Sequence, residues 1–265
     1  MKVLIHKDYQ EMSEAAAKIV ATRIAAHNAQ ESNRPFVLGL PTGSTPIGMY
    51  EKLVEWHREG KLSFQNVVTF NMDEYIGLAP DHPESYHYFM WHHFFSHIDI
   101  PKEQVHILDG LAKDPDAECE EYERQIASFG GIDLFIGGIG SDGHIAFNEP
   151  GSSLTSRTRV KRLSHETIRD NARFFHDNPT EVPTSALTVG VQTVMDAREV
   201  MILINGPKKA RALQQMVEGG VNHLYTASAL QMHPKGILVC DEEAVEELKV
   251  STYRYFKGLT PELEA

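Results

Sequence analysis

Short apolar runs alternate with segments of helical periodicity along almost the whole chain. Between the runs, apolar residues recur every three or four positions, which is the spacing of one face of a helix. Strands that alternate with helices predict a mostly parallel sheet, because parallel strands need a crossover between them. We therefore expect a three-layer, Rossmann-like α/β fold with helices on both faces of the sheet. The apolar runs lie at 36–40, 67–72, 105–108, 132–136, 186–189, 200–204 and 237–240.

Capping residues and breakers predict where the helices begin and end. Asp8 followed by Glu11 resembles a capping box, and it precedes a periodic segment. Thr45 is expected as the N-cap of the next helix, with Pro46 at its first position. Further helices are expected over 85–97, 114–130, 207–219 and 242–256.

Length and composition bound the class of protein. The chain has 265 residues without an internal repeat or a Pro/Gly/Ser-rich linker, so we expect one α/β domain over residues 1–265. Its net charge of −12 disfavours nucleic-acid and membrane partners, which select basic surfaces. Cys119 and Cys240 are too few for a disulfide framework and fit a reducing compartment. Without a signal-peptide pattern or a long apolar run, a cytoplasmic location is expected.

The first candidate site follows the apolar run that ends at Leu40. The segment PTGSTP (41–46) places a glycine among three hydroxyl side chains directly before a helix. Ligands of open α/β sheets bind at the carboxyl ends of the strands, and backbone N–H groups at a helix N-terminus suit a phosphate. An ordinary turn between strand and helix remains the alternative, because the same residue types are common there.

Two further strand ends carry acid–base residues. Asp73 and Glu74 follow the run that ends at Met72, where a partly desolvated carboxylate suits a general base; a solvated loop acid is the alternative. Residues 138–143 match G-x-G-x-x-G, but no helical pattern follows, so we reject a nicotinamide site. What remains is His144 between two carboxylates, Asp142 and Glu149, which is typical of a proton shuttle.

A cluster of histidines does not favour a metal site. His82, His87, His92, His93 and His97 lie among aromatic residues, and no H-E-x-x-H motif or neighbouring cysteine accompanies them. Helix packing or an interface is the better interpretation. No G-x-S-x-G motif supports a serine nucleophile either. We expect neither a metal nor an organic cofactor.

Seven segments carry a family resemblance that spans nearly the whole chain. NMDEY and DGHIAFNEP are the most specific motifs within them. Together the segments resemble the glucosamine-6-phosphate deaminases, and the length is similar to the long, hexameric, allosteric branch of that family. The segments are LGLPTGSTP (38–46), VTFNMDEYIGL (68–78), HPESYHYFM (82–90), GGIGSDGHIAFNEPGSSLTSRTR (137–159), ARFF (172–175), ALTVG (186–190) and VNHLYTASALQMHP (221–234).

The resemblance implies a reaction and a role for each matching residue. The reaction converts glucosamine 6-phosphate and water to fructose 6-phosphate and ammonia without a metal. His144 corresponds to the ring-opening residue, with Asp142 and Glu149 as its partners, and Asp73 corresponds to the base that takes the C2 proton. The substrate phosphate is assigned to Thr42, Gly43, Ser44, Thr45, Arg173 and Lys209.

The resemblance also implies a regulatory site for N-acetylglucosamine 6-phosphate in a homohexamer. Residues 151–173 carry six basic residues in an otherwise acidic chain, which gives this cationic segment a function. Arg162 departs from the family pattern, in which a threonine is expected. The implied regulatory residues are Ser152, Arg159, Lys161, Arg162 and Tyr255.

Two alternatives from other classes stay open at this point. One is a sugar-phosphate lactonase or isomerase of the same fold. The other is a non-catalytic sugar-phosphate sensor, but a sensor has no use for four acid–base residues and needs an output domain for which no residues remain.

Overall fold

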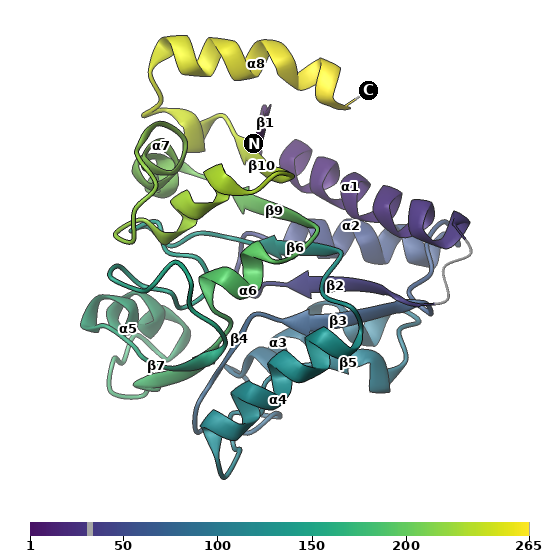
Figure 1. The fold of residues 1–265 in the computed structure, drawn as a ribbon, viewed down its shortest axis with the longest axis vertical. Coiled ribbons are helices and arrows are strands. Elements are labelled where there is room, and N and C mark those ends of the chain that lie inside the picture. The colour runs from purple at the N-terminus through teal and green to yellow at the C-terminus, as the bar shows by residue number, and fades with distance from the viewer. Residues whose placement is uncertain (31–33, 265) are drawn as a thin grey trace.

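A seven-stranded parallel sheet forms the centre of the molecule (Figure 1). The structure is a computed structural model that describes residues 1–30 and 34–264. The order of the sheet is β1-β10-β9-β6-β2-β3-β5, and every neighbouring pair in it is parallel. This arrangement confirms the fold class expected from the sequence. The strands are β1 (Lys2–His6), β2 (Phe36–Leu40), β3 (Val67–Asn71), β5 (Val105–His106), β6 (Leu134–Gly137), β9 (Glu199–Ile204) and β10 (Gly236–Asp241).

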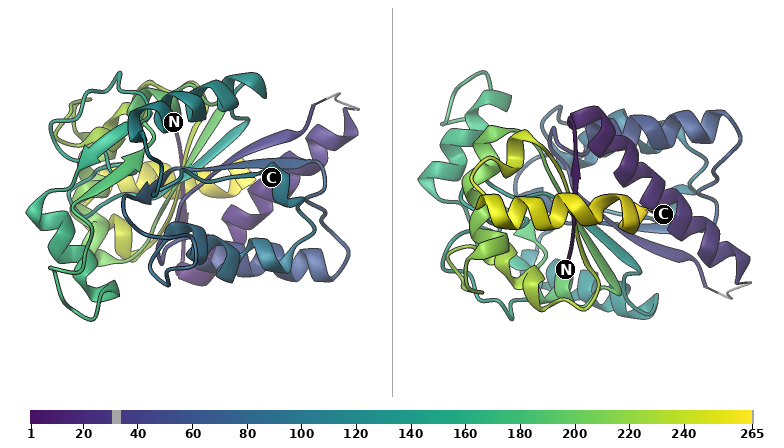
Figure 2. Two further views of the ribbon diagram at one scale, coloured as in Figure 1. Left: turned by 90° about the horizontal axis from the view of Figure 1, so that it is seen from below. Right: turned by 90° about the horizontal axis from the view of Figure 1, so that it is seen from above.

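Two apolar cores cover the two faces of this sheet, because successive side chains of a strand point to opposite faces. In β1, Val3 and Ile5 enter one core, and Leu4 enters the other. Figure 2 shows helices on both sides of the sheet. One face packs against α1 (Tyr9–Ala29), α2 (Ile47–Arg58) and α3 (Tyr86–His93), and the other packs against α4 (Pro115–Ser128), α6 (Val191–Met195) and α7 (Ala210–Glu218).

A second, antiparallel sheet stands beside the central one. It pairs β4 (Asp73–Tyr75), β8 (Ser185–Thr188) and β7 (Arg159–Arg162) in the order β4-β8-β7. The alternating pattern predicts that the run at 186–189 joins the main parallel sheet. It pairs in the antiparallel sheet instead. The chain leaves the main sheet at Met72, whose backbone N–H donates to Leu40 and whose carbonyl accepts from Val189. A third apolar cluster, which includes Tyr75 and Phe147, lies here with α5 (His165–Asn171) close by.

Several element boundaries differ from the sequence-based expectation. The strand β1 was not anticipated, although it forms an edge of the main sheet. The last helix, α8 (Val250–Glu264), begins later than expected and crosses over β1 (Figure 2, right), where Thr260 accepts a hydrogen bond from the Ile5 backbone at 3.3 Å. By covering an edge strand, α8 hides backbone groups that would otherwise be exposed.

Both cysteines of the chain are buried and free. Within residues 1–30 and 34–264, no helix has the length and apolar character needed to cross a membrane.

Candidate active site

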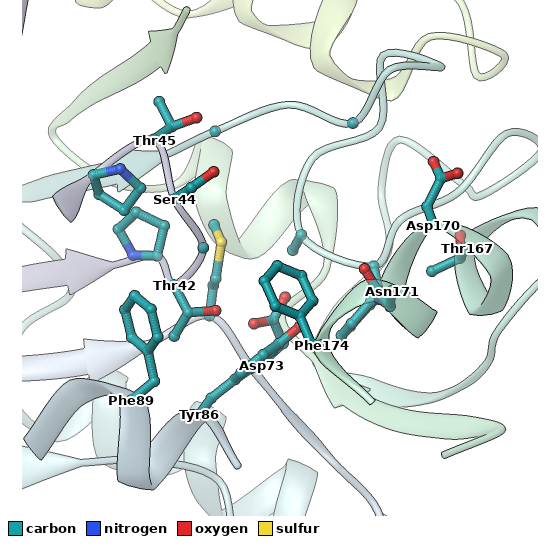
Figure 3. Close-up of a pocket in the computed structure, with 18 of the residues that line it drawn as sticks. Thr42, Ser44, Thr45, Asp73, Tyr86, Phe89, Thr167, Asp170, Asn171 and Phe174 are labelled. Carbon is teal, nitrogen blue, oxygen red and sulfur yellow. The ribbon is translucent and has the colours of Figure 1, made fainter. Parts of the chain in front are cut away.

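One large pocket of about 500 Å³ opens at the carboxyl end of the main sheet (Figure 3). Segments that lie far apart in the sequence line it: the loop after β2, the β3–β4 junction, the start of α3, the turn after β6, and the end of α5 with the residues that follow. Of the ten residues expected to act in catalysis or phosphate binding, nine line this pocket: Thr42, Gly43, Ser44, Thr45, Asp73, Asp142, His144, Arg173 and Lys209.

Asp73 is a buried carboxylate on the pocket floor. Its side chain is at the centre of the close-up, between Thr42 and Phe174 in that view (Figure 3). The residue is only 6% exposed, and it forms no ion pair with any side chain in the described part of the chain. Burial, together with the adjacent charge of Glu74, raises the pKa of Asp73 well above its usual range. A carboxylate of this kind binds a proton more strongly than one in water, as a general base requires.

His144 and Asp142 form a second acid–base group on the turn after β6. The turn closes on itself, since Gly140 donates its backbone N–H to the His144 carbonyl at 2.8 Å. Gly143 has a φ of +82°, which favours glycine. This closure explains why the G-x-G-x-x-G pattern opens no helix.

The Nδ1 atom of His144 lies 2.6 Å from Asp142 Oδ1, although the contact is poorly aligned for a hydrogen bond. Burial opposes ionisation of Asp142, but His144 outweighs it and holds the pKa of Asp142 below its usual value. The pair therefore keeps a carboxylate against the imidazole, which orients the ring.

Glu149 does not lie with this pair. Its carboxylate accepts hydrogen bonds from the Ser164 backbone N–H at 2.9 Å and from the Thr167 hydroxyl. It is 5% exposed and is absent from the pocket lining. The structure shows no direct contact between Glu149 and His144; Ser164, the N-cap of α5, and Thr167 within α5 both donate to Glu149 Oε1 instead.

The loop after β2 holds a glycine in the left-handed region beside three hydroxyl side chains. Gly43 adopts a φ of +92°, and the hydroxyl groups of Ser44 and Thr45 lie along the same wall as Thr42 (Figure 3). Thr45 does not cap α2, as the sequence suggested. Its hydroxyl donates to Asn205 at 2.7 Å, and α2 begins one residue later than predicted, without a side-chain cap.

Two cations from elsewhere in the chain line the same pocket. Lys209 precedes α7, and Arg173 follows α5. Burial and the nearby charge of Arg173 lower the pKa of Lys209. Two cations held close together and partly desolvated are stabilised by a dianionic ligand, so this end of the pocket suits a phosphate.

The sequence reasoning missed the wall that α3 contributes. Tyr86, Phe89 and His93 line the pocket, and Figure 3 shows Tyr86 and Phe89 on the same side of it. The histidine and aromatic segment was interpreted as helix packing or an interface, and periodicity alone could not say which of its faces a cavity would meet. Within the described residues, no group of three or more His, Cys, Asp or Glu side chains is arranged to hold a metal ion.

The expected regulatory residues are brought together only in part. On β7, Arg159 and Lys161 point to one, partly buried, face, and Arg162 lies on the exposed face. Lys161 Nζ lies 3.4 Å from Ser152 Oγ. Tyr255 lies on α8, which Figure 1 shows along the top of the molecule, whereas β7 lies in its lower left part.

Fold and pocket together define an α/β enzyme with titratable groups and two cationic side chains at the carboxyl edge of its sheet. The profile of the glucosamine-6-phosphate isomerases/6-phosphogluconolactonases matches residues 7–238. The chain belongs to this family, and relatives of about 60% identity to it are glucosamine-6-phosphate deaminases.

Two relatives and two solved structures illustrate the similarity. A glucosamine-6-phosphate deaminase of Phocaeicola vulgatus is 63% identical over 98% of both chains, and the human glucosamine-6-phosphate deaminase 1 is 61% identical over 98% of this chain and 89% of its own length. A structure described as a monomeric glucosamine-6-phosphate deaminase has a TM-score of 0.87 at 43% identity, over 92% of this chain and 98% of the other. The 6-phosphogluconolactonase of Trypanosoma brucei shares the fold, with a TM-score of 0.74 at 21% identity over 94% and 98% of the two chains.

Proposed function

We propose that this enzyme converts glucosamine 6-phosphate and water to fructose 6-phosphate and ammonia. The observation that carries the proposal is the placement of Asp73. A buried carboxylate without a cationic partner lies in one pocket with an imidazole–carboxylate pair and a cationic anion site. The reaction needs these three parts: a base for a carbon-bound proton, an acid–base group for the sugar ring, and a holder for the phosphate. The single domain over residues 1–265 supplies all of them.

Ring opening is the first step, and we assign it to His144 with Asp142. The closed sugar must lose the proton of its anomeric hydroxyl and gain one on the ring oxygen. An imidazole can do both, because it accepts and donates protons near neutral pH. The close contact with Asp142 stabilises the imidazolium between the two transfers. We retain Glu149 in the catalytic set as a more distant residue, since its contact to Thr167 links it to the pocket wall.

The proton transfer between carbon atoms follows, and we assign it to Asp73. In the open-chain aldehyde, the C2 proton is acidic because the carbonyl at C1 stabilises the resulting negative charge. Asp73 takes this proton and an enolamine forms. Return of the proton to C1 then gives a ketimine at C2. Positioned proton transfers of this type each contribute roughly 10²–10⁴ in rate.

Hydrolysis of the ketimine completes the reaction. Water adds to C2, the C2–N bond breaks, and ammonia leaves as the ketone of fructose 6-phosphate forms. We assign the phosphate to the backbone of residues 42–45 and to the cations Arg173 and Lys209. A phosphate held at one end of the pocket fixes C1 and C2 at the other end, beside Asp73 and His144.

An ammonia-release assay with glucosamine 6-phosphate, run with and without a chelator, tests the function. We expect equal ammonia release in both conditions. No ammonia in either condition contradicts the assigned reaction, and activity lost only with the chelator contradicts its metal-free character. Hydrolysis of 6-phosphogluconolactone instead would support the lactonase alternative.

We further propose that N-acetylglucosamine 6-phosphate activates the enzyme through Ser152, Arg159, Lys161, Arg162 and Tyr255 in a homohexamer. The cations of β7 and the Lys161–Ser152 contact support a site for a phosphorylated effector. Because α8 lies far from β7 within one chain, Tyr255 can join this site only from a second copy (Figure 1). Because one solved deaminase is described as monomeric, the oligomeric state of this enzyme has to be measured. A cytoplasmic location, supported by two buried free thiols, completes the proposal.

A further inference from the structure

Glu74 is a buried carboxylate that the proposed reaction does not use. It follows Asp73 on β4, where successive side chains point to opposite sides. Asp73 therefore lines the pocket, and Glu74, which is 2% exposed, faces away from it. Its Oε1 accepts hydrogen bonds from the backbone N–H groups of Tyr75 at 2.8 Å and Tyr86 at 3.0 Å, and its Oε2 accepts one from His87 at 2.8 Å.

These contacts join two walls of the pocket. Tyr86 and His87 are the first two residues of α3, whose N-cap Ser85 accepts a hydrogen bond from Tyr88. Glu74 thus satisfies, from a neighbouring strand, helix N–H groups that have no partner within the helix. Because α3 also carries Phe89 to the pocket, Glu74 fixes that wall relative to the strand of Asp73 (Figure 3).

Glu74 also holds charge where no cation compensates it. Burial raises the pKa of Glu74, but the three backbone donors oppose this effect and favour the ionised form. The positive end of the α3 dipole acts in the same direction. Within the described part of the chain, no lysine or arginine lies within ion-pair distance of Glu74, so its charge acts on the neighbouring Asp73.

We propose that Glu74 is a positioning residue for Asp73. Glu74 fixes α3 against β4, and its negative charge beside Asp73 keeps Asp73 a strong proton acceptor. This inference rests on the proposed function, since it needs Asp73 to take the C2 proton. It goes beyond that function by assigning the strength of the base to a residue that does not touch the substrate.

Other titratable groups lie near the two carboxylates, and Glu74→Gln leaves each of them in place, including His87 on α3, whose imidazole pKa is lowered by burial. Burial raises the pKa values of the nearby phenols, so they stay neutral at acid and neutral pH. The carboxylate of Asp109 acts on Glu74, and the charged groups of the pocket are the same in every variant below. The phenols are Tyr75, Tyr86 and Tyr122, and the charged pocket groups are Glu84, His93, Asp142, His144, Glu166, Asp170, Arg173 and Lys209.

The pH profile of kcat/KM for ammonia release tests the proposal, because its acid limb reports the base of the free enzyme. Glu74→Gln removes a like charge, so the pKa of Asp73 falls and the acid limb moves to lower pH by about one unit. One unit below the wild-type midpoint, this variant then keeps roughly half of its own plateau and the wild type about one eleventh, a difference of about fivefold. The plateau kcat of Glu74→Gln falls, because Asp73 becomes a weaker base.

Glu74→Asp separates charge from position. It keeps the negative charge but withdraws it from the α3 N-terminus, so we expect a lower plateau kcat with the acid limb at the wild-type pH. If Glu74→Gln does not fold, Glu74→Asp alone tests the proposal. A displaced acid limb or an unchanged kcat in Glu74→Asp contradicts it. The matched control is Asp114→Asn, which removes a carboxylate that accepts from the Ala117 N–H at the start of α4; its limb stays in place.

Three outcomes overturn the inference while leaving the proposed function intact: an unmoved acid limb in Glu74→Gln, a displaced limb in Glu74→Asp, or an unchanged plateau kcat in Glu74→Asp. A wild-type enzyme that releases no ammonia contradicts the proposed function instead. The two failures are therefore distinguishable in one set of measurements.

Discussion

At the scale of single residues, the pocket separates its ionisable groups by environment rather than by type. Asp73 has no cation to stabilise its charge, so burial raises its pKa, whereas Asp142 faces His144 and has a lowered pKa. Groups whose environments move their pKa values apart are suited to different roles in one reaction. Asp73 is thereby prepared to take a proton, and Asp142 is prepared to stay ionised beside the imidazole.

The first prediction concerns the chemistry of Asp73. Asp73→Asn should abolish exchange of the C2 proton with solvent deuterium, because an amide cannot accept that proton at neutral pH, and substrate binding should be largely kept. Proton NMR of glucosamine 6-phosphate in D₂O measures the exchange, and calorimetry measures the binding. Exchange at the wild-type rate would remove Asp73 from its assigned role.

The second prediction uses the same variant as a stability probe. A carboxylate whose folded-state pKa is raised destabilises the protein as pH rises above the unfolded-state pKa of about 4. Asp73→Asn should therefore raise Tm at pH 8 by at least about 2–4 °C, equivalent to ~1 kcal/mol, and this gain should vanish towards pH 4. Calorimetric melting between pH 4 and 8 measures it; a gain that does not depend on pH would contradict the burial of an ionised Asp73.

The third prediction concerns ring opening. His144→Gln should slow turnover of the cyclic substrate far more than turnover of an analogue that is already open-chain, because only the cyclic form needs the imidazole for its first step. Steady-state rates on both compounds measure the ratio. Equal slowing would move His144 to a later step.

At the scale of elements, the loops at the carboxyl ends of the strands carry the binding groups, and the strands position these loops. The loop after β2 shows this best. Gly43 takes a φ of +92° with open space where a Cβ would lie, so the backbone conformation, not crowding, requires glycine there. Gly60, just after α2, has a φ of +72° and equally open space, but it lies outside the pocket.

The fourth prediction follows from this matched pair of glycines. Gly43→Ala and Gly60→Ala should each lose about 1 kcal/mol of stability, since a left-handed alanine costs roughly 1–2 kcal/mol. Only Gly43→Ala should also raise KM for the substrate, because its strain displaces the N–H groups assigned to the phosphate. Chemical denaturation and saturation curves measure the two effects. An equal KM for the two variants would separate the loop from phosphate binding.

The fifth prediction concerns β7, whose alternation turns Arg159 and Lys161 to one face and Arg162 to the other. Arg159→Ala should remove activation by N-acetylglucosamine 6-phosphate and spare catalysis at saturating substrate, whereas Arg162→Thr should change effector affinity only. Coupling energies of ~1–3 kcal/mol make the loss visible as a several-fold change in apparent substrate affinity. Saturation curves with and without effector measure it; a wild-type curve that ignores the effector would end the regulatory proposal.

At the scale of the whole molecule, an acidic protein concentrates cations where an anionic substrate needs them. The net charge is −12, yet Arg173 and Lys209 both line the pocket. Local fields decide binding at short range, because salt screens more distant charges beyond about 10 Å.

If the enzyme is a hexamer, sedimentation equilibrium should give about six times the chain mass of 29.8 kDa. A single-chain mass would also exclude Tyr255 from a shared effector site.

Local sequence pattern is sufficient to predict the layered α/β architecture and most of the pocket. The alternation of apolar runs and helical segments predicted the parallel sheet, since periodicity reports which side of each element is buried. Motifs directly after β2, β3 and β6 met at one edge, because parallel strands present their carboxyl ends together. Seven of the predicted catalytic and phosphate residues lie on these motifs and line one pocket, whereas Arg173 and Lys209, which also line it, were assigned through the family resemblance.

Features that depend on partners distant in the chain could not be predicted from local pattern. The antiparallel pairing of β8 with β4, the contacts that draw Glu149 towards α5, and the distance between Tyr255 and β7 all have no local signal. Glu74 is the clearest case. Its position after Asp73 predicts only a second acidic residue in a loop. In the structure it accepts hydrogen bonds from three backbone N–H groups, two of them 12 and 13 residues away at the start of α3. Local pattern fixes the face that an element buries, and long-range packing fixes what that face meets.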